Sequence, residues 1–126
     1  MKCKVNGISG LLLFPDSFIW PTGSNAPAES TATKVNTADD DYTVTYTLAQ
    51  FATLELAGCV FLPAGGYRHA STVNSAGSGG SYWSSTPDSS EAKNACYLGF
   101  ASGNVNPASV STRWNGRNVR LVTDSN

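Results

Sequence analysis

The sequence has few charged residues and no long apolar run. Charged side chains make up 13% of its 126 residues, against about a quarter in an average soluble protein. The net charge of −1 gives no reason to expect nucleic acid or an anionic membrane surface as a partner. The strongest apolar run, residues 10–15, has only the length of a strand, so we expect no direct membrane insertion.

The sequence is also poor in metal-binding and catalytic residues. It has three widely spaced cysteines, Cys3, Cys59 and Cys96, and His69 is its only histidine. An odd cysteine count predicts no disulfide framework, and the lack of a CxxC pair argues against zinc. We expect all three thiols to be reduced and structural, as buried free cysteines usually are. The acidic run 39–41 does not have the ligand spacing of an EF-hand, and a solvated acidic turn is the preferred interpretation.

No catalytic residue is predicted. A hydrolase triad would need His69 as its base, and the sequence has no nucleophile-elbow motif. Cys59 and Cys96 lie in apolar strand patterns, where a thiolate is disfavoured. We therefore expect no metal, no cofactor and no enzyme activity.

The chain has the length of one domain, residues 1–126. It enters a strand within its first few residues, which suggests the C-terminal domain of a longer protein. Asn6 and Gly7 predict a hairpin within residues 3–15. A helix is expected at about 48–57, because Thr47 and Gln50 form a capping box and Gly58 suits a helix end.

Several short strands are expected to surround this helix. Residues 16–41 read as a long surface loop, and turns are expected at 102–103 and 115–116. The expected strands are 59–63, 67–69, 82–85, 95–100, 109–114 and 118–122. One helix against short antiparallel strands predicts an α+β fold with long loops.

The alternation of side chains assigns faces to two of these strands. Tyr97 and Gly99 are expected to be exposed. Core positions are expected on the opposite face and in the last strand, at Cys96, Leu98, Phe100, Val119 and Leu121.

Aromatic and arginine side chains mark candidate binding positions. Arg113, Trp114 and Arg117 surround the expected turn at 115–116, and these residue types are enriched at binding hot spots. The alternative is a soluble hairpin tip with Trp114 partly buried. Trp83 has two interpretations as well, a ring that stacks on a sugar or a base, and a buried residue between sheet and loops.

Four segments, in this order, resemble a bacterial C-type lectin-like family: VFLPAGGYR (60–68), GSYWSSTP (80–87), ACYLGF (95–100) and GRNVRLV (116–122). It is the branch related to formylglycine-generating enzyme and to the Fibrobacter succinogenes major paralogous domain. The resemblance covers residues 47–122 and implies a compact, loop-rich C-type lectin-like fold whose exposed strands and loops present a ligand surface.

This branch includes the variable proteins of diversity-generating retroelements, whose C-terminal part is diversified by rewriting adenines, often in asparagine codons. Five asparagines remain in the corresponding region, at 94, 104, 106, 115 and 118. Trp114 does not arise from such a codon and would be a fixed residue. The positions that fit a substituted asparagine are Cys96, Gly99, Ser109, Ser111, Thr112, Arg113 and Arg117.

The resemblance and the residues together predict a non-catalytic ligand-binding (display) domain for a protein or glycan partner, at a bacterial surface, outside the cell or on a phage virion. A surface rich in Tyr, Ser, Asn, Gly and Arg has the composition of an antibody paratope. The expected ligand-binding residues are Tyr97, Gly99, Ser109, Ser111, Thr112, Arg113, Trp114, Arg117 and Asn118.

Two alternatives stay open. The first is a structural or adhesin-tip module, which would use an exposed edge strand to accept a partner strand. The second is an oxidoreductase of the formylglycine-generating type. The resemblance implies that such an enzyme would hold copper with two cysteines. No motif in this sequence places Cys59 and Cys96 in a matching arrangement. The iron enzymes of the same branch resemble a three-histidine site, which a single histidine cannot form.

Overall fold

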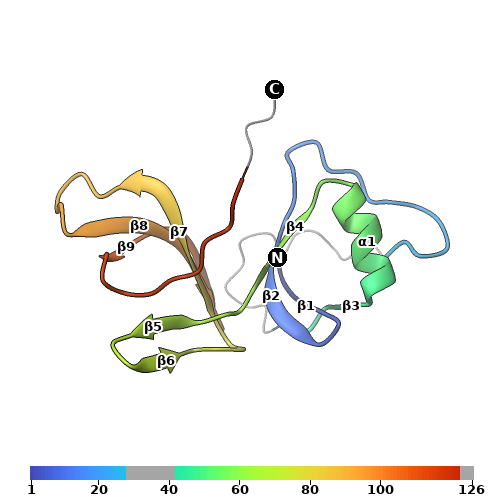
Figure 1. The fold of residues 1–126 in the computed structure, drawn as a ribbon. Coiled ribbons are helices and arrows are strands. Elements are labelled where there is room, and N and C mark those ends of the chain that lie inside the picture. The colour runs from blue at the N-terminus through green and yellow to red at the C-terminus, as the bar shows by residue number, and fades with distance from the viewer. Residues whose placement is uncertain (28–41, 123–126) are drawn as a thin grey trace.

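The computed structural model describes residues 1–27 and 42–122, and within them the chain forms nine strands and one helix (Figure 1). A four-stranded sheet has the order β3-β1-β2-β4. Its elements are β1 (Lys2–Val5), β2 (Ile8–Leu13), β3 (Thr45–Tyr46) and β4 (Val60–Pro63), with helix α1 (Leu48–Leu56) inserted before β4. No helix in the described ranges has the length and apolar character needed to span a bilayer.

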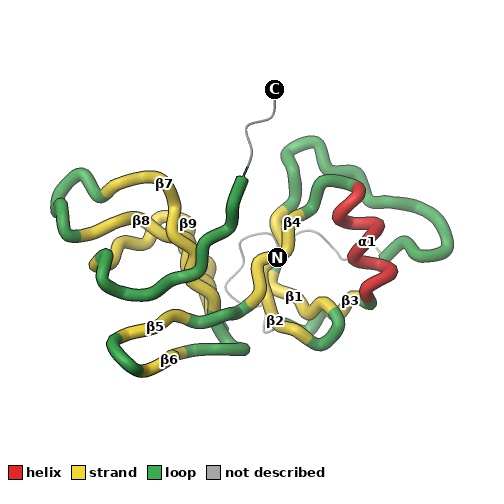
Figure 2. The backbone as a smooth tube through the Cα atoms, viewed as in Figure 1, coloured by secondary structure: helices red, strands yellow, loops and turns green. Residues whose placement is uncertain are grey.

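Two further sheets follow along the chain, and Figure 2 shows them on the other side of the molecule from α1. A two-stranded ribbon consists of β5 (Tyr67–His69) and β6 (Thr72–Asn74). A three-stranded antiparallel sheet, which we call the C-terminal sheet, consists of β7 (Gly80–Pro87), β8 (Asn94–Ala101) and β9 (Asn104–Thr112).

The local signals in the N-terminal half are confirmed. Asn6 and Gly7 have φ angles of 49° and 81°, as a two-residue hairpin turn requires. The Thr47 hydroxyl accepts a hydrogen bond from the Gln50 backbone, and the Gln50 side chain accepts one from the Thr47 backbone. The helix ends before Gly58, which has a φ of 89°.

Strand β2 contributes side chains to two separate hydrophobic cores. Leu12 is fully buried with Cys3, Leu54 and neighbouring residues, between the four-stranded sheet and α1. Its neighbour Leu11 belongs to a second core, together with Phe100 of β8. Successive residues of a strand point to opposite faces, and β2 is therefore buried on both sides at Leu11 and Leu12.

The second core attaches the C-terminal sheet to the rest of the molecule. Phe100 is 3% exposed and packs with Leu11 and Leu62, while the Tyr82 ring stacks on the Phe100 ring at 6.3 Å. Lys2 Nζ also donates a 3.0 Å hydrogen bond to the Ala101 carbonyl oxygen. The C-terminal sheet is thus supported by packing along one face.

The expected α+β, C-type lectin-like fold is wrong. In the described residues the molecule is nearly all β, with three sheets and a single helix of nine residues. That helix packs on one sheet only and does not form a layer of its own. Except for the strand expected at 118–122, the short strands that the sequence predicted do form, and they assemble into separate sheets.

The expected last hairpin is also wrong. The chain turns at 112–115, and Gly116 then forms a bridge to Arg68 instead of starting a return strand. Asn118 forms an isolated parallel bridge to Tyr82. Val119 and Leu121, expected in the core, are 67% and 87% exposed, because within the described residues the pairing with β7 does not continue beyond Asn118. The acidic run 39–41 and most of the expected loop 16–41 lie outside the described residues.

Candidate functional site

The two faces of the C-terminal sheet differ in chemistry. Tyr82, Leu98 and Phe100 face the second core. On the other face Tyr97 of β8 stands opposite Trp83 of β7 and Ser109 of β9. The next row on that face has Gly99 opposite Ser81 and Asn106. We call this second side, with its aromatic, small and amide side chains, the polar face.

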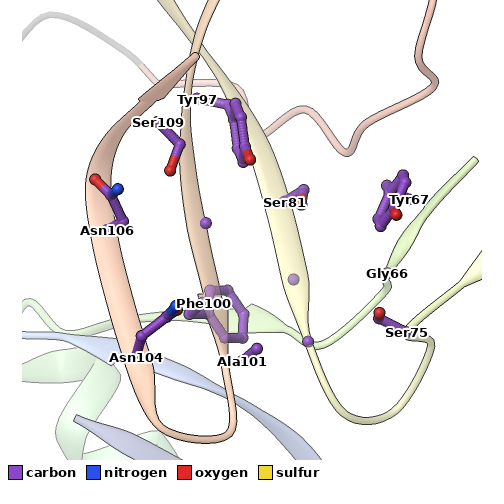
Figure 3. Close-up of a pocket in the computed structure, with 13 residues that line it drawn as sticks. Gly66, Tyr67, Ser75, Ser81, Tyr97, Phe100, Ala101, Asn104, Asn106 and Ser109 are labelled. Atoms are coloured by element: carbon purple, nitrogen blue, oxygen red, sulfur yellow. The ribbon is translucent and has the colours of Figure 1, made fainter. Parts of the chain in front are cut away.

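The polar face carries a cavity of about 200 Å³. Figure 3 shows the β9 side chains Asn104, Asn106 and Ser109 along one wall, with Tyr67 and Ser75 on the opposite side. Pockets for drug-sized ligands have roughly 300–1,000 Å³, so this cavity suits one sugar ring or one side chain. The remaining lining residues are Gly66, Gly79, Gly80, Ser81, Tyr97, Gly99, Phe100 and Ala101.

Gly99 leaves space for the ring of Tyr97. A Cβ atom at position 99 would lie 2.9 Å from Tyr97 Cε2 and 3.6 Å from Ser109 Oγ. The strand pairing also shifts between Tyr97 and Gly99, where β8 and β9 contain a bulge. Bulges redirect side chains at binding sites. Gly99 has no side chain, and the bulge lies beside it. The backbone at this position therefore forms the floor of the cavity next to Tyr97.

Arg117 lies among three aromatic rings at the rim of this cavity. Its guanidinium carbon is 3.7 Å from the centre of the Tyr97 ring and 5.2 Å from the centres of Tyr67 and Trp83. The Trp83 and Tyr97 rings meet edge to face at 6.0 Å. We call these four residues the arginine cage. Cation–π contacts of this kind contribute about 0.5–2 kcal/mol each, most when water is excluded.

A second hollow lies next to the cavity, with a volume of about 270 Å³. Gly66 and Tyr67 line both. Arg117 lines the second hollow, and two of its ring partners, Tyr67 and Tyr97, line the first. The cage therefore stands between the two depressions.

The sequence-predicted site residues divide into three groups. Tyr97, Gly99 and Ser109 line the cavity, and Arg117 stands at its rim. Trp114 is 71% exposed beyond the end of β9 and does not line the cavity.

The other predicted residues are held in place by hydrogen bonds. Ser111 Oγ and Thr112 Oγ1 each accept a 3.1 Å bond from Asn115 Nδ2. Arg113 Nε donates to the Asn94 carbonyl oxygen at 2.9 Å. Asn118 Nδ2 donates to the carbonyl oxygens of Gly66 and Ser81 at 3.0 and 3.1 Å. These two hydrogen bonds connect the segment after β9 to β7 and to the loop before β5.

Sequence reasoning missed several lining residues. Asn104 and Asn106 were not predicted as site residues, because the expected strand began at residue 109, whereas β9 begins at Asn104. Tyr67 and Ser75 lie on the ribbon and on the turn after it. No local pattern links these two to β8, because their approach depends on how separate sheets pack.

The cysteines and His69 are not among the residues that line the cavity. All three cysteines are free, as predicted, and Cys3 and Cys59 are buried. Burial raises the pKa of the Cys3 thiol to about 12 and also raises the pKa of Cys59. His69 Nδ1 is 2.8 Å from the amide oxygen of Asn115. Within the described ranges no three His, Cys, Asp or Glu side chains are grouped to hold a metal ion.

A family model described as "Domain of unknown function (DUF8237)" matches residues 27–122. The chain therefore belongs to this family. The matched region runs from before α1 to the end of the described chain and includes every residue of the cavity and of the arginine cage. The chain matches none of the curated proteins and none of the solved structures with which it was compared.

Proposed function

We propose that this protein is a non-catalytic ligand-binding domain that displays the polar face of its C-terminal sheet to a protein or glycan partner. The observation that carries the proposal is the cavity on that face, which includes Tyr97, Gly99 and Ser109 in its lining. These residues come from two neighbouring strands whose opposite face is packed on the second core.

The chemistry of the cavity suits recognition. Tyrosine offers a large contact area with few rotatable bonds, while serine and asparagine provide adaptable hydrogen bonds. Ser81, Asn104 and Ser109 line the cavity with Tyr97. Because the strands behind them are fixed by Phe100 and Leu11, a ligand would meet side chains that are already positioned, and preorganised contacts favour binding.

The same face supports the further proposal that the domain is diversified, as the resemblance to retroelement variable proteins implies. Gly99, Asn104, Asn106 and Ser109 are asparagines or candidate substituted asparagines, and all four line the cavity. Exchange of these side chains would alter the ligand without entering the core. The test is the encoding DNA: an adjacent repeat that differs at adenines and a nearby reverse transcriptase gene are expected. We expect such a domain at a bacterial surface, outside the cell or on a phage virion.

The binding proposal is tested by titrating the labelled protein with a panel of monosaccharides, amino acids and short peptides. In amide NMR spectra we expect shifts to concentrate on residues around Tyr97, Gly99 and Ser109. Ser109→Trp should fill the cavity and abolish the shifts. Leu56→Trp, a large substitution at an exposed position of α1, is the control and should preserve them. Ligand shifts scattered over other surfaces, or an unaffected Ser109→Trp variant, would contradict the proposal.

A further inference from the structure

Within residues 1–27 and 42–122, the positive charge of Arg117 has no counter-ion. In the part of the chain that the structure describes, its guanidinium forms no hydrogen bond and no ion pair, and its contacts are the three rings of the cage. Nε is buried without a partner, whereas the terminal nitrogens keep contact with solvent. A ligand group can therefore reach the ends of the guanidinium but not its stem.

The charge of the chain segment that forms the cavity and the cage is also one-sided. Residues 64–122 contain Arg68, Lys93, Arg113, Arg117 and Arg120, but only two carboxylates, Asp88 and Glu91. Both carboxylates lie in the loop between β7 and β8 and are already engaged. Asp88 accepts hydrogen bonds from Ser90, and Glu91 pairs with Lys93 at 3.1 Å. An anionic ligand would thus meet little repulsion from this segment.

The cage holds the Arg117 side chain in an arrangement that suits an anion. Three rings restrict the side chain before any ligand arrives, so less rotamer freedom is lost on binding. Arginine presents paired N–H donors that match the two oxygens of a carboxylate. Aromatic faces cover the guanidinium without neutralising it, and the charge remains available to a group that enters beside Tyr67 and Tyr97.

We infer that the cavity binds one acidic sugar unit of a glycan, with the carboxylate of the sugar on Arg117. This inference rests on the proposed function and specifies its ligand. The ring hydroxyls would bond to Ser81, Asn104, Asn106 and Ser109, which supply hydroxyl and amide groups along the cavity wall.

The lining favours a sugar over an acidic peptide. A protein partner typically anchors an apolar side chain in a desolvated hole. Apart from glycines, only Phe100 and Ala101 contribute purely apolar side chains to the cavity. A sugar ring offers hydrogen-bonding groups on all sides, and these suit the serines and asparagines, while its C–H face suits an aromatic ring. The volume of about 200 Å³ suits a single ring.

The experiment compares glucuronic acid, glucose and acetate in NMR titrations of the whole chain, followed at the amides of Gly99 and Ser109. We expect glucuronate to bind at least about tenfold more tightly than glucose, a difference that corresponds to one charge-assisted contact, and acetate to bind weakly. Raising the salt concentration should reduce the difference in affinity between glucuronate and glucose, because salt screens the charge interaction. Arg117→Gln should reduce glucuronate to the level of glucose, whereas Arg120→Gln, which removes the same charge outside the cage, should not.

Each other outcome overturns the inference in a recognisable way. Equal binding of glucose and glucuronate at the cavity would remove the role of the carboxylate but leave the proposed function standing. Acetate as tight as glucuronate would mean that the ring is not recognised and that an acidic peptide is the better candidate. No response of the cavity amides to any probe would reject the acidic sugar. If Arg117→Gln lowers the melting temperature, the comparison of glucuronate, glucose and acetate in the native protein still tests the inference. Arg117→Lys then tests the effect of the positive charge without the planar guanidinium group.

Discussion

The hydroxyl group of Tyr82 donates a 2.7 Å hydrogen bond to the backbone carbonyl oxygen of Pro63. This bond joins β7 of the C-terminal sheet to the end of β4 in the four-stranded sheet, next to the stacked rings of Tyr82 and Phe100. Burial raises the pKa of the phenol, against a smaller opposing effect of Arg120. The donor therefore remains protonated at neutral pH.

Tyr82→Phe should lower the free energy of unfolding by about 0.5–1.5 kcal/mol, the usual net value of one hydrogen bond. The ring packing is retained, and the loss is therefore confined to the hydroxyl. Urea unfolding followed by circular dichroism measures the change. Tyr67→Phe is the matched control and should be nearly neutral, because no described group is hydrogen-bonded to its hydroxyl. Equal effects of the two substitutions would contradict this role for Tyr82.

Gly80 and Phe100 should be energetically coupled. A Cβ atom at position 80 would lie 2.2 Å from Phe100 Cζ, and we expect Gly80→Ala to cost about 1–3 kcal/mol through overpacking. Phe100→Leu shortens the opposing side chain. The double variant should therefore cost less than the sum of the two single changes, with a coupling of about 0.5–3 kcal/mol. Additive costs in urea unfolding would indicate that the sheet moves apart to accept the methyl group.

Stability should fall at alkaline pH because of Cys3. Burial raises the pKa of its thiol from 9.0 to about 12. Between these two values the unfolded chain loses a proton that the folded protein retains, so the free energy of unfolding decreases as pH rises. Cys59 acts in the same direction, and Tyr46, with a pKa of about 12 against 10.0, adds to the loss above pH 10.

The measurement is urea unfolding at intervals from pH 8 to pH 10. The native protein should be unaffected by these groups below about pH 9 and should lose stability above it. Cys3→Ala should be less stable at every pH and should show a flatter dependence. A variant with the same slope as the native protein would show that the buried thiol is not the cause.

Asn118 and Ser109 should respond differently to alanine. Asn118→Ala removes the donor to the Gly66 and Ser81 carbonyl oxygens, and leaving such groups unpaired costs about 1–3 kcal/mol. Ser109 lines the cavity without a hydrogen bond from its hydroxyl in the described structure. Ser109→Ala should stay within about 0.5 kcal/mol of the native protein. A large loss of stability in Ser109→Ala would mean that the polar face supports the fold.

The local structure of this chain was largely predictable from its sequence. A left-handed turn at Asn6–Gly7, a capping box at Thr47 and a helix end at Gly58 each depend on residues only a few positions apart. The same reasoning failed at Asn115–Gly116, which has the pattern of a hairpin turn. Gly116 pairs instead with Arg68, a partner that no local pattern identifies.

The candidate site was predictable only in part, for the same reason. Alternation along β8 placed Tyr97 and Gly99 on the side opposite Phe100, and both line the cavity. The exposure of Val119 and Leu121 was not predictable, because alternation gives a face only when a strand forms. The arginine cage depends on Tyr67 and Arg117 meeting across fifty positions of sequence, and only the packing of the sheets brings them together.

Alternate residues of strand β8 lie on opposite faces of the sheet and have different roles. Leu98 and Phe100 pack in the second core, whereas Tyr97 and Gly99 lie on the polar face and line the cavity. Mutation of an outward position leaves its inward neighbours in register, since a strand repeats every two residues. Descendants of this protein could therefore accumulate substitutions at the outward positions of β8 and still inherit the same architecture.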